Sequence, residues 1–170
     1  QYCDEIDPAA EIIGSVNTLV RRDGRLTGYN TDIDGFLYTL RRAGISLKGK
    51  KVLILGSGGA SLTARAAAKT EGARQVVVVS RAGEDNYENL PDRHGDAEVL
   101  INTTPVGMWP KLEGSPVDLR LLPKLTDVAD VIYNPGRTNL LLQAEELGLR
   151  RAGGLPMLVQ QAKRAEELFF

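Results

Sequence analysis

Cysteine and histidine are almost absent from this sequence, which has one of each, Cys3 and His94, among its 170 residues. A single cysteine excludes an internal disulfide framework and any multi-cysteine metal site, and one histidine cannot form a zinc site alone. We therefore expect no bound metal. The scarcity of cysteine also fits a reducing compartment, so we expect a cytoplasmic protein.

An excess of charge and long apolar runs are lacking too. The 21 basic and 22 acidic residues nearly cancel, and lysines and arginines adjoin only in pairs, so the electrostatic footprint of a nucleic-acid-binding protein is missing. The longest apolar runs, at 52–55 and 76–79, fall far short of the roughly 20 residues that a membrane helix needs. We expect a small molecule as the partner, not nucleic acid or a membrane. No feature of the sequence indicates an oligomeric state.

What the sequence does contain is an alternation of strand-like and helix-like segments. Short apolar strands are predicted at 51–55, 75–80, 97–104 and 127–134, and helices at 61–72 and 139–148. Apolar strands without polar alternation, each followed by a helix or crossover, indicate a parallel sheet covered on both faces. The predicted fold class is α/β, with a doubly wound parallel Rossmann-type sheet.

A smaller piece precedes this sheet, and one helix follows it. A short helix is predicted at 8–13, and two strands at 16–20 and 25–30 form a hairpin because the Asp23-Gly24 turn tolerates positive φ angles. Apolar residues at helical spacing then predict a helix that starts near Asp32 and stops at Gly44. A last helix runs from about 156 to 170.

The strongest local motif is the glycine-rich turn that follows the first apolar strand. In KVLILGSGGAS, Gly56 permits a tight turn, and Gly58 lets a phosphate approach the backbone at the start of a helix. Ser61 stands where the usual fingerprint has its third glycine. The order of strand, glycines and helix still predicts a dinucleotide site, and a glycine turn without ligand is the alternative. The candidate cofactor residues here are Gly56, Ser57, Gly58, Gly59 and Ala60.

The end of the next strand indicates which dinucleotide would bind. Where an NAD-binding protein usually offers a carboxylate to the ribose, this chain has Ser80 and Arg81. A guanidinium can pair with the 2′-phosphate of NADP, so NADP is the expected cofactor. Glu84 and Asp85 nearby weaken this preference, and an arginine that merely extends from a strand end into solvent is the alternative.

Polar residues also follow the strand at 97–104. In INTTPVGM, Asn102, Thr103 and Thr104 lie at the carboxyl edge of the sheet, where ligands bind in doubly wound folds, and we expect their hydrogen-bonding groups to line a cofactor channel. Thr103 and Thr104 are the further candidate cofactor contacts. A polar strand end without function is equally consistent with this motif.

Two aspartates in GYNTDIDGF require separate interpretations. Asp32 lies at a strand-to-helix junction, where a rigid scaffold can aim a carboxylate at a cleft, and the alternative is that it only caps the helix starting at Ile33. Asp34 falls in the first helical turn, where its charge favours the helix dipole, so we interpret it as structural. A calcium loop is excluded, because no glutamate follows at the required distance.

Six motifs together resemble the shikimate dehydrogenase family. They are, in chain order, GSVNT, NTD-x-DG, LGSGGAS, NTTPVGM, VIYNP and GGLPMLVQQA, and they cover the chain from about Ala10 to Leu168. The resemblance implies a two-domain enzyme that uses NADPH to reduce 3-dehydroshikimate to shikimate in aromatic amino-acid biosynthesis. It implies that 1–46 is the remnant of an α/β substrate domain, that 47–153 binds NADP, and that 154–170 returns toward the substrate domain.

The same resemblance implies roles for single residues. Asp32 corresponds to the acid/base aspartate. The implied substrate contacts are Asn17, Thr31, Tyr133 and Gln161. Gly154 and Met157 match positions beside the nicotinamide, and Val131 matches a backbone contact to the cofactor. Gln160 and Gln161 point about 100° apart on a helix, so at most one of them faces the cleft.

The sequence departs from this family in two ways. The family pairs its aspartate with a lysine from an earlier segment, which we expect to lie upstream of Gln1, so that the chain alone is inactive. The interval between Arg81 and Ile101 is also too short for a helix and a further strand, so we expect the sheet to be shortened by one strand and to end at 75–80. The wall of the adenine pocket would then be thinner. The SRAG sequence also lacks the asparagine and threonine that commonly flank the family's arginine, so we expect binding of the 2′-phosphate to depend largely on Arg81 and the NADP preference to be weaker than is usual in the family.

Two other functions remain open at this point. A quinate/shikimate dehydrogenase would share these motifs. A nucleotide-binding regulatory domain could keep the fold and lose catalysis. A folate dehydrogenase is a more distant possibility, which GSVNT and NTD-x-DG disfavour.

Overall fold

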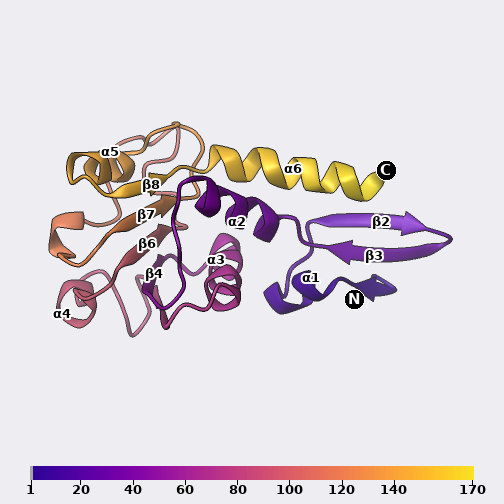
Figure 1. The fold of residues 1–170 in the computed structure, drawn as a ribbon, viewed down its shortest axis with the longest axis horizontal. Coiled ribbons are helices and arrows are strands. Elements are labelled where there is room, and N and C mark those ends of the chain that lie inside the picture. Colours follow the sequence, from indigo (N-terminus) through magenta and orange to yellow (C-terminus); the bar gives the residue numbers. More distant parts are fainter. Residues whose placement is uncertain (1) are drawn as a thin grey trace.

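The computed structural model describes residues 2–170, which form two β-sheets and six α-helices (Figure 1). The elements in chain order are β1 (Glu5–Ile6), α1 (Pro8–Ile13), β2 (Thr18–Arg22), β3 (Arg25–Tyr29), α2 (Asp32–Arg42), β4 (Lys51–Leu55), α3 (Gly59–Thr70), β5 (Gln75–Val79), α4 (Leu90–His94), β6 (Val99–Asn102), a 3-10 turn η1 (Leu119–Leu121), β7 (Asp127–Asp130), α5 (Asn139–Glu146), β8 (Arg150–Ala152) and α6 (Leu155–Phe169).

The larger sheet has five parallel strands in the order β5-β4-β6-β7-β8. Alternate residues of each strand point to opposite faces, so Val52 and Ile54 pack in one apolar cluster while Leu53 and Leu55 pack in the other. Helices α2 and α3 contribute to the first cluster, and α4, α5 and η1 to the second. The predicted doubly wound α/β fold is therefore confirmed. Strand β8 was not predicted.

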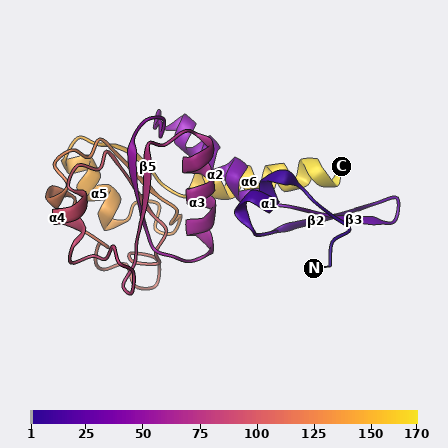
Figure 2. The same cartoon turned by 90° about the horizontal axis from the view of Figure 1, so that it is seen from below.

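The sheet ends at β5 on one side, as the short interval after Arg81 predicts. Only α4, five residues long, lies between β5 and β6, so no further strand is added beyond β5. The turned view in Figure 2 shows β5 at this edge of the sheet.

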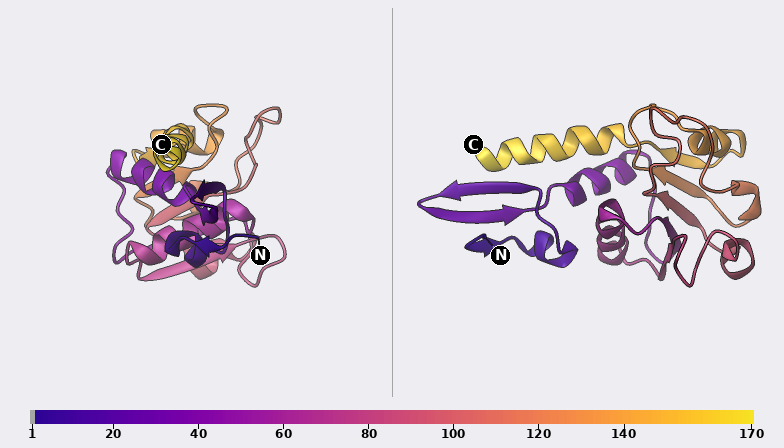
Figure 3. Two further views of the ribbon diagram at one scale, coloured as in Figure 1. Left: turned by 90° about the vertical axis from the view of Figure 1, so that its right-hand side faces the viewer. Right: turned by 180° about the vertical axis from the view of Figure 1, so that it is seen from behind.

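The smaller sheet has the order β1-β3-β2, with β1 parallel to β3 and β2 antiparallel to it. Asp23 and Gly24, at the tip of the β2–β3 hairpin, have φ angles of 50° and 81°, as the sequence predicts for this turn. The hairpin lies at the far end of the molecule from the parallel sheet, and both chain ends are near it (Figures 1 and 3).

Helices α2 and α6 pack side by side between the two sheets (Figure 3). Gly35 makes this close packing possible, because a Cβ at that position would lie 2.6 Å from the carbonyl oxygen of Met157. Helix α6 then continues along β2, where Arg22 donates to the carbonyl of Leu168 at 2.8 Å. None of the helices in residues 2–170 combines the length and the apolar composition needed to cross a bilayer.

Candidate active site

A cavity of about 380 Å³ lies where the starts of three helices meet the end of strand β7. This size is typical of small-molecule sites. The walls come from the residue before β2 and from α2 on one side, and from α3, the loop after β7 and α6 on the other. The lining residues are Asn17, Asp32, Ala60, Val131, Tyr133, Gly154, Met157, Leu158 and Gln161. Eight of these nine are residues that the sequence singles out; Leu158 is the exception.

Asp32 is held at the edge of this cavity by its backbone. Its N–H donates to Oδ1 of the buried Asn30 at 3.0 Å, and the Asn30 amide donates to the carbonyl of Ser15 at 3.0 Å. The helix begins at Asp32 itself, and Thr31 occupies the N-cap position without a capping side-chain bond. The interpretation of Asp32 as a cap for a helix starting at Ile33 is therefore wrong, because its carboxylate lies one position inside the helix. That carboxylate faces the cavity.

Asn17 connects β2 to the start of α2. Its Oδ1 accepts from the Thr31 N–H at 3.0 Å, from Oγ1 of Thr31 at 3.3 Å and from Oγ1 of Thr18 at 3.0 Å. These bonds engage the oxygen of the amide, which leaves its NH₂ group to face Asp32. Burial raises the pKa of Asp32, and hydrogen bonding with Asn17 opposes part of that rise. A carboxyl group with a raised pKa holds a proton more readily, as a general acid must.

The remaining polar wall comes from two elements. Gln161 projects from α6, and its Oε1 lies 3.4 Å from Oγ1 of the buried Thr31, which stands behind the wall and does not line it. Gln160 is not among the lining residues, as the helical spacing predicts. Tyr133, half exposed, comes from the loop after β7. Asp34 lies outside the cavity, where its Oδ2 is 3.6 Å from Nε of Arg164.

The glycine turn between β4 and α3 forms an open cradle beside the cavity. Gly56 has a φ of 101°, and a Cβ there would meet Thr103 Oγ1 at 3.0 Å. Cβ atoms on Gly58 and Gly59 would meet nothing within 4 Å, so a ligand can approach this backbone. Ser57 lies exposed between Gly56 and Gly58, and α3 has no side chain capping its first N–H groups. Oγ of Ser61, only 1% exposed, has no hydrogen-bond partner within residues 2–170. These features fit the pyrophosphate of a dinucleotide.

The other predicted cofactor residues flank this cradle on neighbouring strands. Ser80 and Arg81 follow β5, and Thr103 and Thr104 follow β6, on either side of β4. Oγ1 of Thr103 donates to the carbonyl of Leu55 at 2.6 Å, which holds the threonine against the cradle. All of these residues lie at the carboxyl ends of parallel strands, the usual ligand edge.

A buried network that the sequence did not indicate supports the cavity wall after β7. Oδ1 of Asp130 accepts from Nδ2 of Asn102 at 3.1 Å and from the N–H of Ile132 at 3.1 Å, and its Oδ2 accepts from Oγ1 of Thr138 at 2.7 Å. Oδ1 of Asn102 in turn accepts from Oγ1 of Thr104 at 2.7 Å. Asn102 is fully buried, so the expectation that it lines a cofactor channel is wrong. The network joins the two loops that carry the predicted cofactor and substrate contacts. Only the acidic residue at the strand end could have pointed to it.

Val131 and Gly154 are in direct contact across this wall. A Cβ on Gly154 would lie 2.0 Å from the carbonyl oxygen of Val131, so only glycine fits, and the N–H of Gly154 donates to the carbonyl of Ile132 at 3.0 Å. This contact fixes the start of α6, and with it Met157, beside the loop after β7. The predicted contacts Val131, Gly154 and Met157 therefore form one surface of the cavity.

Comparison with known proteins gives one consistent result. No protein-family model matches the chain. A shikimate dehydrogenase (NADP+) of Bacillus cereus (strain B4264) is 37% identical over 187 aligned positions, which include 99% of this chain and 68% of that protein. Because the alignment is longer than the 170 residues here, that relative contains residues that this chain lacks.

Solved structures are equally similar. A chorismate mutase/shikimate 5-dehydrogenase fusion protein from Clostridium acetobutylicum matches with a TM-score of 0.91 and 36% identity, over 98% of this chain and 64% of that one. A 5-ketofructose reductase of Gluconobacter matches with a TM-score of 0.85 and 33% identity, over 99% of this chain and 68% of that one. The chain thus spans about two thirds of the length of its relatives. With this identity over nearly its whole length, the chain belongs to the shikimate dehydrogenase family.

Proposed function

We propose that this chain carries the NADP-binding part and one wall of the substrate site of a shikimate dehydrogenase. The observation that carries the proposal is the cavity that Asp32 and Asn17 line together with Ala60, which follows the glycine turn, and with the Val131–Gly154 surface. The family membership supports it, since the Bacillus cereus relative is named a shikimate dehydrogenase (NADP+). The reaction is the reversible reduction of 3-dehydroshikimate to shikimate.

The substrate and the cofactor are proposed to bind to different parts of the chain, which correspond to the two sheets. Residues 1–46 contribute to the substrate side, residues 47–153 bind the cofactor, and residues 154–170 return along the substrate side. The scarcity of cysteine supports a cytoplasmic location, and the proposed partners are the substrate and NADP.

Each polar residue of the cavity has a proposed role in carbonyl reduction. Bound NADPH supplies a hydride to the carbonyl carbon, and the carbonyl oxygen then needs a proton. Asp32 holds that proton and also accepts it back in the reverse reaction. Asn17 and Gln161 offer amide groups to ring hydroxyls, and Tyr133 offers its phenol. Thr31 holds Asn17 and Gln161 in place from behind the wall, which is a positioning role.

Cofactor contacts are proposed for the residues at the carboxyl edge of the parallel sheet. N–H groups of Gly58, Gly59 and Ala60 hold the pyrophosphate, and Arg81 pairs with the 2′-phosphate. Thr103 and Thr104 line the path between these two positions and the cavity. Val131, Gly154 and Met157 form the surface for the nicotinamide ring.

The cavity has no lysine among its lining residues, whereas the family pairs its aspartate with one. We therefore expect the 170-residue chain to bind NADPH and to turn over slowly. A second candidate is a nucleotide-binding domain without catalysis. A quinate/shikimate dehydrogenase is a third, and the two substrates assayed in parallel distinguish it.

The deciding experiment measures binding and rate separately. Isothermal titration calorimetry gives the NADPH affinity of the chain, and NADPH oxidation with 3-dehydroshikimate gives the rate, with and without a small alkylammonium ion that can stand in for a lysine side chain. We expect Asp32→Asn to keep the NADPH affinity and to lower the alkylammonium-supported rate by roughly 100-fold or more.

Asp34→Asn is the matched control, because Asp34 is two residues further along, exposed and outside the cavity. An equal loss in both variants would remove Asp32 from the chemistry. NADPH binding without any supported turnover would favour the non-catalytic domain.

A further inference from the structure

The loop after β5 closes on itself just beyond Arg81. The N–H of Ser80 donates to the carbonyl of Asp85 at 3.1 Å, and the N–H of Gly83 donates to the carbonyl of Ser80 at 3.3 Å. A Cβ on Gly83 would lie 2.8 Å from Oγ of Ser80, so the turn is tight. Because of this turn, the backbone of Asp85 comes back beside the strand end from which Arg81 leaves.

The two acidic side chains of this loop are held by the last turn of α4. Arg93 pairs with the Glu84 carboxylate at 3.0 Å and with Oδ1 of Asp85 at 3.0 Å, and it also donates to the carbonyl of Glu84 at 3.1 Å. Nε2 of the buried His94 lies 2.8 Å from the same Oδ1 of Asp85. Bonding to His94 is the main cause of a lowered pKa of Asp85, followed by the charge of Arg93. Both carboxylates are therefore directed at α4.

Arg81 remains exposed and takes no part in these pairs. No carboxylate within residues 2–170 lies within ion-pair distance of its guanidinium. Its charge reaches the half-buried Tyr87, where it opposes the rise that burial causes in the pKa of the phenol. Among the described residues, Arg81 is thus a cation of this loop that no carboxylate contacts.

We infer that Arg93 is a specificity-determining residue for NADP, because it binds the loop's two carboxylates and so prevents them from repelling the 2′-phosphate or pairing with Arg81. This inference rests on the proposed NADP function. His94 assists through Asp85, and neither residue needs to touch the cofactor.

The physical reason is the charge that the 2′-phosphate brings. A phosphate monoester carries about −1.5 to −2 charges at neutral pH, so it is repelled by every unpaired carboxylate within a Debye length of about 8–10 Å. Glu84 and Asp85 follow Arg81 by only three and four residues, and the bond from the Ser80 N–H to the Asp85 carbonyl at 3.1 Å folds this segment back beside the end of β5. NAD has no 2′-phosphate, so its affinity is insensitive to the same charges. The ratio of the NADP affinity to the NAD affinity therefore measures how strongly the carboxylates repel the 2′-phosphate.

The test compares single charge removals on the intact 170-residue chain. Dissociation constants for NADP+ and NAD+ are measured by calorimetry at one fixed ionic strength. Arg93→Gln is expected to weaken NADP+ binding by roughly threefold to fivefold and to leave NAD+ binding unchanged, a size typical of one screened surface charge. The double variant with Arg93→Gln and Glu84→Gln is expected to regain most of the ratio between the NAD+ and NADP+ dissociation constants.

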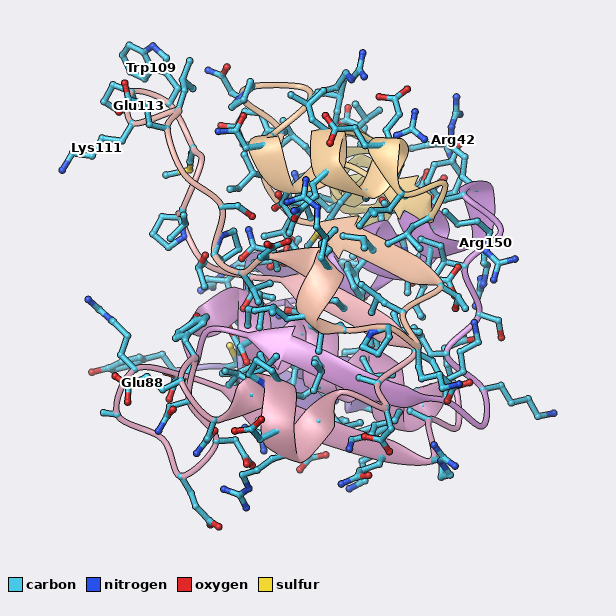
Figure 4. The ribbon with its side chains drawn as sticks, turned by 90° about the vertical axis from the view of Figure 1, so that its left-hand side faces the viewer. Arg42, Glu88, Trp109, Lys111, Glu113 and Arg150 are labelled. Carbon is cyan, nitrogen blue, oxygen red and sulfur yellow. The ribbon has the colours of Figure 1, made fainter. Side chains whose placement is uncertain are left out.

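Arg74→Gln is the matched control. Arg74 lies just before the opposite end of β5, where it pairs with Glu98 at 3.5 Å, so the variant loses the same charge far from the loop. Glu88 projects from the outer side of the loop (Figure 4), and because it is present in every variant, its effect cancels. Arg81→Gln is the positive control for the 2′-phosphate site.

The outcomes separate the two claims. If Arg81→Gln abolishes the discrimination and Arg93→Gln behaves like Arg74→Gln, the role of Arg93 is overturned while the proposed NADP site stands. If the unchanged chain does not distinguish NADP+ from NAD+, the NADP site itself fails. If Arg93→Gln weakens both cofactors equally, Arg93 only supports the loop, and the specificity role is overturned.

Discussion

The two ends of strand β7 carry one aspartate each, and the two side chains have different kinds of partners. Asp127 begins the strand and Asp130 ends it, and they are 0% and 2% exposed. Asp127 is paired with Lys50 and with Arg150, which is labelled in Figure 4. Asp130 has only neutral donors, from Asn102, Ile132 and Thr138. The carboxylate of Asp127 is thus paired with cations, whereas the carboxyl group of Asp130 is not.

The difference is visible in the direction of the two pKa shifts. Burial raises the pKa of each carboxyl group, but at Asp127 the hydrogen bonds from Arg150, Lys50 and Thr126 outweigh burial and lower it. At Asp130 burial prevails over the neutral bonds, and the pKa is raised. The amino ends of the strands therefore stabilise the sheet, whereas the carboxyl ends hold the loops that form the cavity.

Replacing Asp127 tests the stabilising end and has the largest expected effect. Asp127→Asn leaves two cations without a counter-charge, of which Arg150 is half exposed, so we expect a loss of about 3 kcal/mol in unfolding free energy. In a domain of this size, that corresponds to a fall in Tm of about 6–12 °C. Thermal unfolding followed by circular dichroism measures it. Glu71→Gln, which breaks the exposed pair with Arg41, is the control and should change Tm very little.

The equivalent change at the other end should cost less. In Asp130→Asn, the amide oxygen keeps two of the bonds, and the hydroxyl of Thr138 can reverse its role and accept from the new NH₂ group. We expect a loss of about 1 kcal/mol, near the value of one hydrogen bond. Urea unfolding of both variants gives the comparison. Equal losses at Asp127 and Asp130 would remove the distinction between the two ends.

The contributions of Asp127 and Asp130 to the unfolding free energy should change with pH in opposite directions. The folded pKa of Asp127 lies below its ordinary value of 3.8, so its stabilising contribution is present at neutral pH and is lost as the pH falls through 3.8 and below. The folded pKa of Asp130 lies above 3.8, so its carboxyl group contributes most at low pH, and the contribution falls as the pH rises.

Stability measurements at neutral pH and near pH 4 test this directly. On acidification, the difference in unfolding free energy between the unchanged chain and Asp127→Asn should shrink. The unfolding free energy of the unchanged chain relative to that of Asp130→Asn should increase. Changes of the same sign for both variants would contradict the assignment.

Asp32 extends the comparison to the cavity and has the smallest expected effect on stability. Burial raises its pKa, so its charged form is unfavourable in the folded chain at neutral pH. Since the group is partly exposed and solvent screens it, we expect Asp32→Asn to raise Tm by only about 1–2 °C. Differential scanning calorimetry measures this, with Asp34→Asn as the control. A lower Tm would mean that the carboxylate of Asp32 supports the fold.

Much of the fold follows from the sequence because buried parallel strands are short and wholly apolar. Strands β4 and β5 were predicted on this basis, as was the shortened edge of the sheet. Strand β8, with the sequence RRA, was missed because its two arginines carry no apolar signal, and β1 has only two residues. Such strands exist because neighbouring strands bind them, which is a tertiary effect.

The candidate site was predictable to a similar extent. Motifs identified the residues that face the cavity, but not the residues that hold them. Asn30 stands within the NTD-x-DG motif, but its bond to Ser15, like the bond of Asp130 to Asn102, joins residues distant in sequence, so no local pattern indicates these bonds. The sequence also predicted that Glu84 and Asp85 weaken NADP binding, and it could not indicate that both would be bound by Arg93.

The loop between β6 and η1 gives the cavity a built-in optical reporter. It carries Trp109, the only tryptophan of the chain, 63% exposed, with Lys111 and Glu113 at the tip (Figure 4). The N–H of Trp109 donates to the carbonyl of Asn134 at 3.0 Å, next to Tyr133 in the cavity wall. The residue that carries the one indole fluorophore of the chain is therefore hydrogen-bonded through its backbone to the neighbour of a cavity-lining residue, and the indole emission can be followed without a label.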